Sequence, residues 1–305
     1  MTSTELSVAR TMFETMMGDA TASGEATTID EMRAAYDTMC AKLEIPSDVQ
    51  ITEVVIAGVP CIDVRATDGE PDRTIVWLHS GGYAIGSPAG YRSLGAHLSA
   101  ASGARVVLVD YRLAPENPFP AALDDAAAVY RAIVAEQDGG AGRCVLAGDS
   151  AGGGLVMATL VKIRDAGDEL PSCAVCCSPW VDLAQTGDSL DSNAAIDPAV
   201  SRGMLEMCTA MYLGEGDRYN PLASPLYADL ARLPPLFVLV GTAETLLDDA
   251  RRLSDRATAA GVDVTLRVAD GMIHIFPLFV SFLPEAKEAV AEIGDFIRSH
   301  AKKLA

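Results

Sequence analysis

Gly148-Asp149-Ser150-Ala151-Gly152 joins an apolar, β-favouring run to a helix-favouring one, and this junction decides the fold class of the 305-residue chain. The pattern is G-x-S-x-G, in which small neighbours allow a strained strand-to-helix turn that projects the serine hydroxyl. A phosphate-binding glycine turn is the alternative, but neither GK[ST] nor G-x-G-x-x-G follows. Ser150 is therefore predicted to be a nucleophile.

The same alternation of short apolar runs and helix-length segments extends on both sides of this junction. Apolar runs bounded by turn residues are typical of strands buried on both faces, and their alternation with helices predicts a mostly parallel sheet with right-handed crossovers. The predicted strands are Thr74–Leu78, Arg105–Val109, Cys144–Ala147, Ala174–Cys177, Leu236–Val240 and Val264–Val268. The predicted helices are Tyr91–Ser102, Ala121–Glu136, Ala151–Ala166, Thr245–Ala260 and Pro284–Lys303.

Two segments depart from this rhythm. Residues 1–45 have helical periodicity, and residues 182–225 hold no strand-helix unit. A long insert of that kind usually covers a site or is helical by itself. We therefore expect residues 1–45 and 182–225 to form a helical cap over a core of residues 46–181 and 226–305. The core is expected to start with an antiparallel pair, Ile51–Ile56 and Cys61–Ala66.

A serine nucleophile needs a base, and the chain has four histidines. His97 and His300 lie in predicted helices, where surface or packing roles suffice. His274 follows the last predicted strand, at the sheet edge where α/β proteins bind ligands, so it is the predicted base. The acid that orients it should follow the strand Leu236–Val240. Glu244 is the best placed, and Asp248 and Asp249 also suit the start of the next helix.

Acyl transfer also requires donors for a developing oxyanion. His79-Ser80-Gly81-Gly82 follows a predicted strand, and its glycines permit close approach of backbone N–H groups to a substrate. The N–H of Ala151, directly after the nucleophile, would complete the set. A simple tight turn explains the glycine pair equally well when it is taken alone.

These motifs together resemble those of the hormone-sensitive-lipase-like (family IV) esterases of the α/β-hydrolase fold. They are His79-Ser80-Gly81-Gly82, Tyr111-Arg-Leu-Ala-Pro-Glu116, Gly148–Gly153, Glu244-Thr-Leu246 and Gly271-Met-Ile-His274-Ile-Phe276. The resemblance implies catalysis by Ser150, His274 and Glu244, with Gly81, Gly82 and Ala151 as oxyanion donors. Two positions depart from the family pattern, because Ser80 replaces the first glycine of HGGG and Glu244 replaces an aspartate.

The substrate is predicted to be a small-molecule ester with a short-to-medium acyl chain. Methionines at helical spacing could line an apolar pocket or simply pack the cap against the core. The predicted pocket residues are Tyr83, Trp180, Met204, Met207 and Met211, and Met12, Met16 and Met17 are N-terminal candidates. A lactone hydrolase with the same triad is the alternative, and a non-catalytic ligand-binding scaffold is a distant one.

Bulk composition excludes several other classes of protein. With 23 Lys+Arg against 42 Asp+Glu, the net charge of −19 repels nucleic acids and anionic membranes. The start lacks the pattern of a signal peptide, so a cytoplasmic location is expected. Seven cysteines in such a chain predict reduced, buried thiols, although Cys173 and Cys176 have CxxC spacing. We expect no metal or organic cofactor, and the resemblance implies a homodimer.

Overall fold

The structure is a computed structural model, and it describes residues 3–19, 28–66 and 72–301. Its described strands form one sheet in the order β1-β2-β4-β3-β5-β6-β7-β8. The strands are β1 (Val49–Ile56), β2 (Val59–Ala66), β3 (Thr74–Leu78), β4 (Arg105–Val109), β5 (Cys144–Asp149), β6 (Cys173–Cys177), β7 (Leu236–Gly241) and β8 (Val264–Ala269). The six neighbouring strands β4, β3, β5, β6, β7 and β8 run parallel to one another. Strand β2 is antiparallel to both of its neighbours, β1 and β4. The predicted fold class and the antiparallel pair are confirmed.

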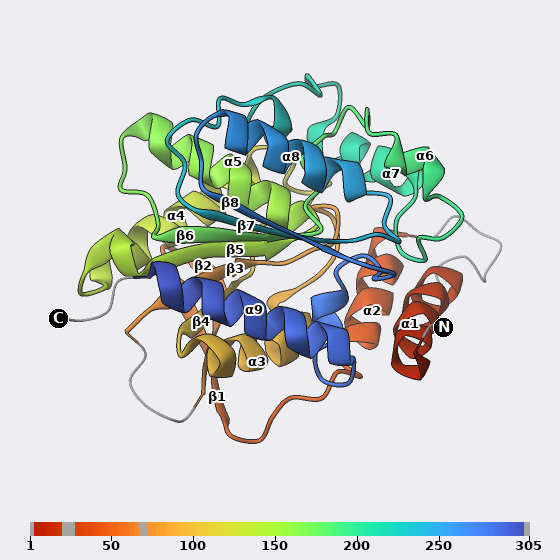
Figure 1. The fold of residues 1–305 in the computed structure, drawn as a ribbon, viewed down its shortest axis with the longest axis horizontal. Helices are drawn as coiled ribbons and strands as arrows, with labels where there is room; N and C mark the ends of the chain where they lie inside the picture. The colour runs from red at the N-terminus through yellow and green to blue at the C-terminus, as the bar shows by residue number, and fades with distance from the viewer. Residues whose placement is uncertain (1–2, 20–27, 67–71, 302–305) are drawn as a thin grey trace.

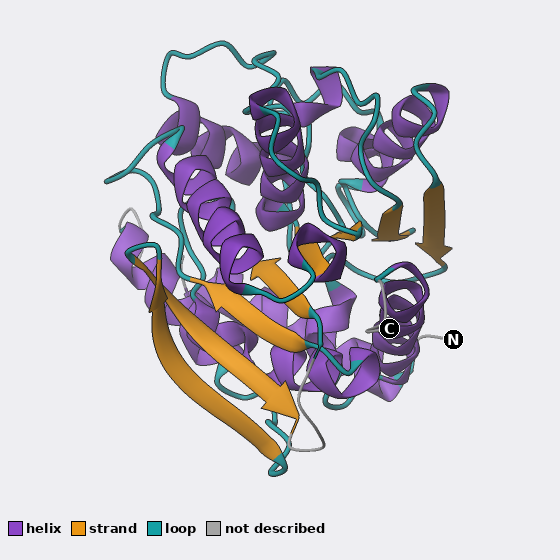
Figure 2. Cartoon of the chain, turned by 90° about the vertical axis from the view of Figure 1, so that its left-hand side faces the viewer, coloured by secondary structure: helices purple, strands orange, loops and turns teal. Residues whose placement is uncertain are grey.

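Helices cover both faces of the sheet. They are α1 (Thr4–Asp19), α2 (Ile29–Cys40), α3 (Arg92–Ser102), α4 (Ala121–Glu136), α5 (Ala151–Ala166), α6 (Ser189–Ser192), α7 (Arg202–Leu213), α8 (Leu247–Ala259) and α9 (Pro284–His300). Figure 1 shows α3 and α9 on one face and α5 and α8 on the other. Because both faces are covered, every residue of β3, β5, β6 and β7 is buried. The side view of Figure 2 shows this layering, with the hairpin of β1 and β2 at one edge.

The carboxyl ends of the parallel strands meet at one end of the sheet. Leu78 of β3 is level with Gly148 of β5, and Gly241 of β7 is level with Ala269 of β8. The loops that follow these strands therefore converge, although they are far apart in the sequence. The helices α1, α2, α6 and α7 lie near this end, on the right of Figure 1.

The N-terminal helices form largely as predicted. A capping box begins α2, because the Thr28 N–H donates to Glu31 Oε2 (2.8 Å) and the Glu31 N–H donates to Thr28 Oγ1 (3.3 Å). Residues 20–27, between α1 and α2, lie outside the described part of the chain. The last predicted helix, Pro284–Lys303, is observed as Pro284–His300, and its predicted end also lies outside the described residues.

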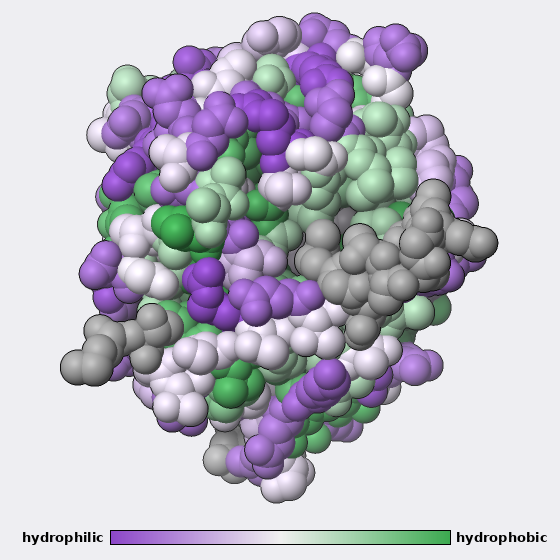
Figure 3. All heavy atoms as spheres, turned by 90° about the vertical axis from the view of Figure 1, so that its right-hand side faces the viewer, coloured by the Kyte–Doolittle hydropathy of each residue, from purple (hydrophilic) through white to green (hydrophobic). Residues whose placement is uncertain are grey.

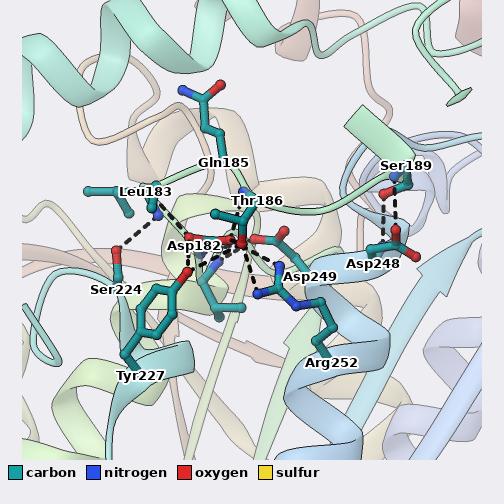
Figure 4. A network of polar contacts seen from close by, with 12 residues as sticks. Asp182, Leu183, Gln185, Thr186, Ser189, Ser224, Tyr227, Asp248, Asp249 and Arg252 are labelled. Carbon is teal, nitrogen blue, oxygen red and sulfur yellow. Dashed lines mark hydrogen bonds and ion pairs between the residues drawn. The ribbon is translucent and has the colours of Figure 1, made fainter. Parts of the chain in front are cut away.

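The insert 182–225 contains α6 and α7 and is joined to α8 by a polar network around the buried Asp182 (Figure 4). Asp182 is central to this network, since its carboxylate accepts from the Thr186 hydroxyl (2.6 Å), the Tyr227 hydroxyl (3.0 Å) and the Arg252 guanidinium (3.0 Å). Asp249 of α8 accepts from the backbone N–H groups of residues 181 and 182. These contacts hold the start of the insert against the body of the protein.

The end of the molecule that carries α1, α2 and α7 has a mixed surface. Figure 3 shows hydrophobic and hydrophilic side chains interspersed over the part of this end that described residues form. No helix of the described residues is long and apolar enough to cross a membrane.

Candidate active site

Ser150 occupies a strained turn between β5 and α5. Its φ of 54° and ψ of −122° are unfavourable for a residue with a side chain. The turn can close only because the residues two positions before and after Ser150 are glycines. A Cβ on Gly148 or Gly152 would lie 2.6 Å or 2.0 Å from the carbonyl oxygen of Leu78. Hydrogen bonds hold the strained backbone on both sides, because the Ser150 N–H donates to the Cys177 carbonyl (2.9 Å) and the Ser150 carbonyl accepts from the Trp180 N–H (2.9 Å).

His274 lies in the loop after β8 and contacts Ser150 directly. Its Nε2 is 2.9 Å from the Ser150 Oγ, and its Nδ1 is 2.9 Å from Glu244 Oε2. With a proton on Nδ1 donated to the carboxylate, Nε2 is free to accept the serine proton. The structure thus brings together three residues that are separated by 94 and 30 positions in the sequence (150 to 244, and 244 to 274).

Glu244 is fully buried and accepts hydrogen bonds on both of its oxygens. Oε1 accepts from the Gly241 N–H (2.6 Å) and from the Ser178 hydroxyl (2.9 Å), while Oε2 faces His274. Burial raises the pKa of Glu244, against the effect of these donors. Burial also opposes the charged form of His274, but the Glu244 carboxylate outweighs it and raises the pKa of His274.

The two alternative acids lie elsewhere. Asp248 and Asp249 are in the first turn of α8, as expected, and both are used to hold backbone. Asp248 Oδ2 accepts from the Ser189 N–H (2.8 Å), and Asp249 holds the start of the insert (Figure 4). Glu244 is therefore the acid that faces His274.

The other three histidines have hydrogen-bond partners other than Ser150. His79 Nδ1 is 2.7 Å from the Ser80 carbonyl oxygen, and burial lowers the pKa of His79 to about 4. His97 lies on α3 with its Nδ1 2.8 Å from the Ser93 carbonyl, and His300 lies in the last turn of α9.

Ser178 is a residue of the site that the sequence reasoning missed. It follows β6, is 1% exposed and bridges two loops, because its hydroxyl donates to Glu244 Oε1 and accepts from the Ile275 N–H (3.0 Å). The acid loop and the histidine loop are therefore joined through one side chain. Its position at the carboxyl end of a predicted strand, in an otherwise apolar stretch, was the available signal.

The loop after β3 has the backbone geometry that the glycine pair predicts. Gly81 and Gly82 have φ values of 118° and 61°, in the region that favours glycine. A Cβ on Gly81 would lie 2.1 Å from the Ile85 carbonyl oxygen, and one on Gly82 would lie 2.5 Å from the Cys208 sulfur. Within the described residues, the N–H groups of Gly81, Gly82 and Ala151 have no hydrogen-bond acceptor. They are available to a ligand beside Ser150.

An apolar cavity with an open volume of about 50 Å³ lies over Ser150 and His274. Its walls come from the N-terminal helices, the glycine loop and the insert. The lining residues are Phe13, Met16, Met32, Tyr36, Ser80, Gly81, Gly82, Ala84, Ile85, Ser150, Ala199, Val200, Met204, Cys208, Met211, His274 and Ile275. By the same measure one water needs about 10–15 Å³, so the cavity admits a group the size of a few waters.

The predicted pocket residues divide into two groups. Met204 and Met211 line the cavity from one face of α7, and Met16 lines it from α1. Met207 does not line the cavity, contrary to the prediction, and its side chain is 38% exposed at the edge of the face that carries Met204 and Met211.

Tyr83 and Trp180 do not line the cavity either, contrary to the prediction, because both are buried in the hydrophobic core. The Tyr83 ring stacks on Tyr212 at 3.8 Å and lies 5.9 Å from the Trp180 ring. Met12 is partly buried against the hydrophobic core, and the side chain of Met17 lies outside the described residues.

The seven cysteines are free and buried, and burial raises the pKa of Cys176 and Cys177. Neither thiol is therefore activated as a thiolate at neutral pH. Among the residues that the structure describes, no group of three or more His, Cys, Asp or Glu side chains is arranged to hold a metal ion.

Known proteins resemble this chain in sequence and in structure. A family profile described as alpha/beta hydrolase fold matches residues 75–278. An acetyl-hydrolase of Streptomyces hygroscopicus is 40% identical over 98% of each chain, and an esterase of Acinetobacter venetianus is 34% identical over 88% of each chain. A solved structure of an esterase from the bacterial hormone-sensitive lipase (HSL) family is 44% identical, with a TM-score of 0.94 over 98% of this chain and 99% of that one.

Proposed function

Because this chain belongs to the hormone-sensitive-lipase-like (family IV) carboxylesterases of the α/β-hydrolase fold, and is a carboxylic ester hydrolase, we propose that it cleaves short-to-medium acyl esters through Ser150, His274 and Glu244. The observation that carries this proposal is the unbroken hydrogen-bonded series from the Ser150 Oγ through both nitrogens of His274 to Glu244. Each contact is 2.9 Å, within reach for proton transfer without rearrangement.

Acylation starts when the Ser150 oxygen attacks the ester carbonyl carbon and His274 Nε2 takes the serine proton. The carbonyl oxygen becomes an oxyanion, and the N–H groups of Gly81, Gly82 and Ala151 are the proposed donors to it. The buried Glu244 carboxylate stabilises the imidazolium that forms. His274 then protonates the leaving alcohol as the tetrahedral intermediate collapses to an acyl-serine.

Deacylation repeats these steps with water. His274 removes a proton from the water that attacks the acyl carbon, and the same donors stabilise the second oxyanion. His274 then returns the proton to the Ser150 oxygen as the acyl group leaves as the free acid. All acid–base steps use His274, so neither a metal ion nor an organic cofactor has a role in this proposal.

The cavity supports a short acyl group or a small alcohol moiety. Apart from Ser150 and His274, it is lined mainly by apolar groups, which favour an uncharged substrate. Helices α1, α2 and α7 contribute the wall opposite the triad. We therefore propose that residues 1–45 and 182–225 act as a cap that sets the size of the substrate.

The test is hydrolysis of 4-nitrophenyl acetate, butyrate and octanoate and of a small lactone panel. We compare the wild type with Ser150→Ala, Glu244→Ala and the matched control Asp248→Ala. Turnover of short esters that is lost in Ser150→Ala, severely reduced in Glu244→Ala and nearly retained in Asp248→Ala supports the proposal. Rates that peak with a long-chain ester such as 4-nitrophenyl palmitate, added as a fourth ester, would refute the substrate range. Faster opening of lactones than of esters would make the chain a lactone hydrolase.

A further inference from the structure

Ser80 is the position at which this chain departs from the HGGG pattern, and its side chain has well-defined partners. Its Oγ lies 2.7 Å from the Tyr36 hydroxyl and 2.7 Å from the Tyr91 hydroxyl, and its N–H donates to the Tyr91 oxygen at 3.1 Å. All three residues are at least 97% buried. Ser80 directly precedes Gly81, so these contacts fix the backbone where the glycine pair begins.

The hydroxyl cluster of Tyr36, Ser80 and Tyr91 extends to the nucleophile turn. The Tyr91 hydroxyl donates to Asp149 Oδ2 at 2.6 Å, and Asp149 directly precedes Ser150. Burial raises the pKa of Asp149 to about 7, and donation from Tyr91 opposes that rise. The loop that carries Gly81 and the turn that carries Ser150 are thus joined through the side chain of Tyr91.

Helix α2 also holds the other end of the glycine loop. The Arg33 Nε donates to the Ala84 carbonyl oxygen at 2.9 Å, and Arg33 Nη2 donates to the Ala114 carbonyl at 3.0 Å. Glu116 orients Arg33 through a two-pronged ion pair (2.9 Å and 2.7 Å). Arg33 and Tyr36 are three residues apart, so they lie on the same face of α2.

We propose that α2 positions the oxyanion donors, with the Tyr36 and Ser80 hydroxyls holding the start of the Gly81–Gly82 loop and Arg33 holding its end. The inference rests on the proposed function, in which Gly81 and Gly82 are those donors. Glycines have wide conformational freedom, so the direction of their N–H groups is set by whatever holds the residues around them. Donors that are preorganised toward the transition state act on kcat, and small displacements weaken them. Tyr36 and Ser80 are therefore positioning residues.

The experiment compares Tyr36→Phe, Ser80→Ala and the double variant with the wild type. Tyr130→Phe is the matched control, because the buried Tyr130 also loses one hydroxyl hydrogen bond, to the Glu169 carbonyl (2.7 Å), far from the site. Each protein is assayed for thermal unfolding and for kcat and KM with 4-nitrophenyl acetate. The inhibition constant of an alkyl trifluoromethyl ketone is also measured, since this ketone adds to the serine as a tetrahedral oxyanion.

We expect each single variant to lower kcat by about fivefold to twentyfold, the effect of one or two displaced hydrogen bonds and less than the loss of a whole donor. KM should change by less than about twofold, and the ketone should bind more weakly in proportion to the loss of kcat/KM. Because Tyr36 and Ser80 share one contact, the double variant should lose little more than the worse single variant.

The proposal is overturned if Tyr36→Phe and Ser80→Ala both keep kcat and ketone affinity within about twofold of Tyr130→Phe. If Ser80→Ala does not fold, Tyr36→Phe, which removes one oxygen atom, decides the result alone. Failure of the proposed function is a separate outcome, because the ketone would then not inhibit the wild type, or Ser150→Ala would keep its activity.

Discussion

Replacing Ser178 by alanine tests whether one hydroxyl holds the acid loop and the histidine loop together. Ser178→Ala removes two contacts at once. Glu244 Oε1 loses a donor at 2.9 Å, and the Ile275 N–H loses its acceptor at 3.0 Å. Both partners are buried, so water cannot readily replace the missing oxygen.

The expected cost follows from these two contacts. A hydrogen bond to a charged group contributes about 1.5–3 kcal/mol, and a buried N–H left without an acceptor costs about 1–3 kcal/mol. Some relaxation is expected, so we predict a loss of about 3 kcal/mol in the free energy of unfolding. Activity should also fall, by about tenfold in kcat, because Glu244 keeps only the Gly241 N–H to hold Oε1 and orients His274 less well.

Urea unfolding and the kcat for 4-nitrophenyl butyrate measure the two effects. The matched control is Ser254→Ala, because Ser254 is also buried and its hydroxyl donates only to the Ala250 carbonyl within α8 (2.8 Å). We expect this control to lose less than about 1 kcal/mol and no activity. If Ser178→Ala matched Ser254→Ala in both stability and kcat, the bridging role assigned to Ser178 would be wrong.

Three further predictions concern the base, the pocket and the insert. The fall of kcat/KM toward low pH should have its midpoint above the ordinary imidazole pKa of 6.5, because His274 must be neutral to act and its pKa is raised. Glu244→Gln should move that midpoint to lower pH, and an unmoved midpoint would contradict the role of Glu244. Met204→Ala should enlarge the cavity and raise kcat/KM for longer acyl chains by about fourfold for each added methylene that becomes buried. Met207 is exposed, so Met207→Ala should leave the dependence on chain length unchanged. Arg252→Met should lower the free energy of unfolding in urea by about 2 kcal/mol, because it leaves the buried Asp182 without its cation. Arg202→Met, which breaks an exposed ion pair, should lower it by less than about 0.5 kcal/mol, and equal losses would refute the difference.

The strands and most helices could be predicted because their causes are local. A strand buried on both faces must be apolar along its length, and β3 and β4 were predicted to the residue. The strained turn at Ser150 also has a local signature, since only small residues fit beside the Leu78 carbonyl. Placement after predicted strands then indicated His274 and Glu244, because parallel strands bring their following loops to one edge.

Residues that act through distant partners could not be found in this way. Ser178 contacts a carboxylate 66 positions further along the chain and an N–H 97 positions along, and nothing in its own segment encodes either distance. Met207 and Met204 are both helix residues with similar chemistry, yet only Met204 lines the cavity. The rotation of α7 against the body decides between them, and packing sets that rotation.

The sequence by itself determined the strand-helix alternation, the nucleophile turn and the order of the candidate catalytic residues, because local sterics and buried apolar runs dictate them. Only the tertiary structure decided which side chains form the cavity, that Tyr83 and Trp180 are buried elsewhere, and that α2 reaches both ends of the glycine loop. Those features depend on how separate elements pack. A hydrogen bond such as Tyr36 to Ser80 exists only after two segments that are independent in the sequence have been brought within 3 Å of each other.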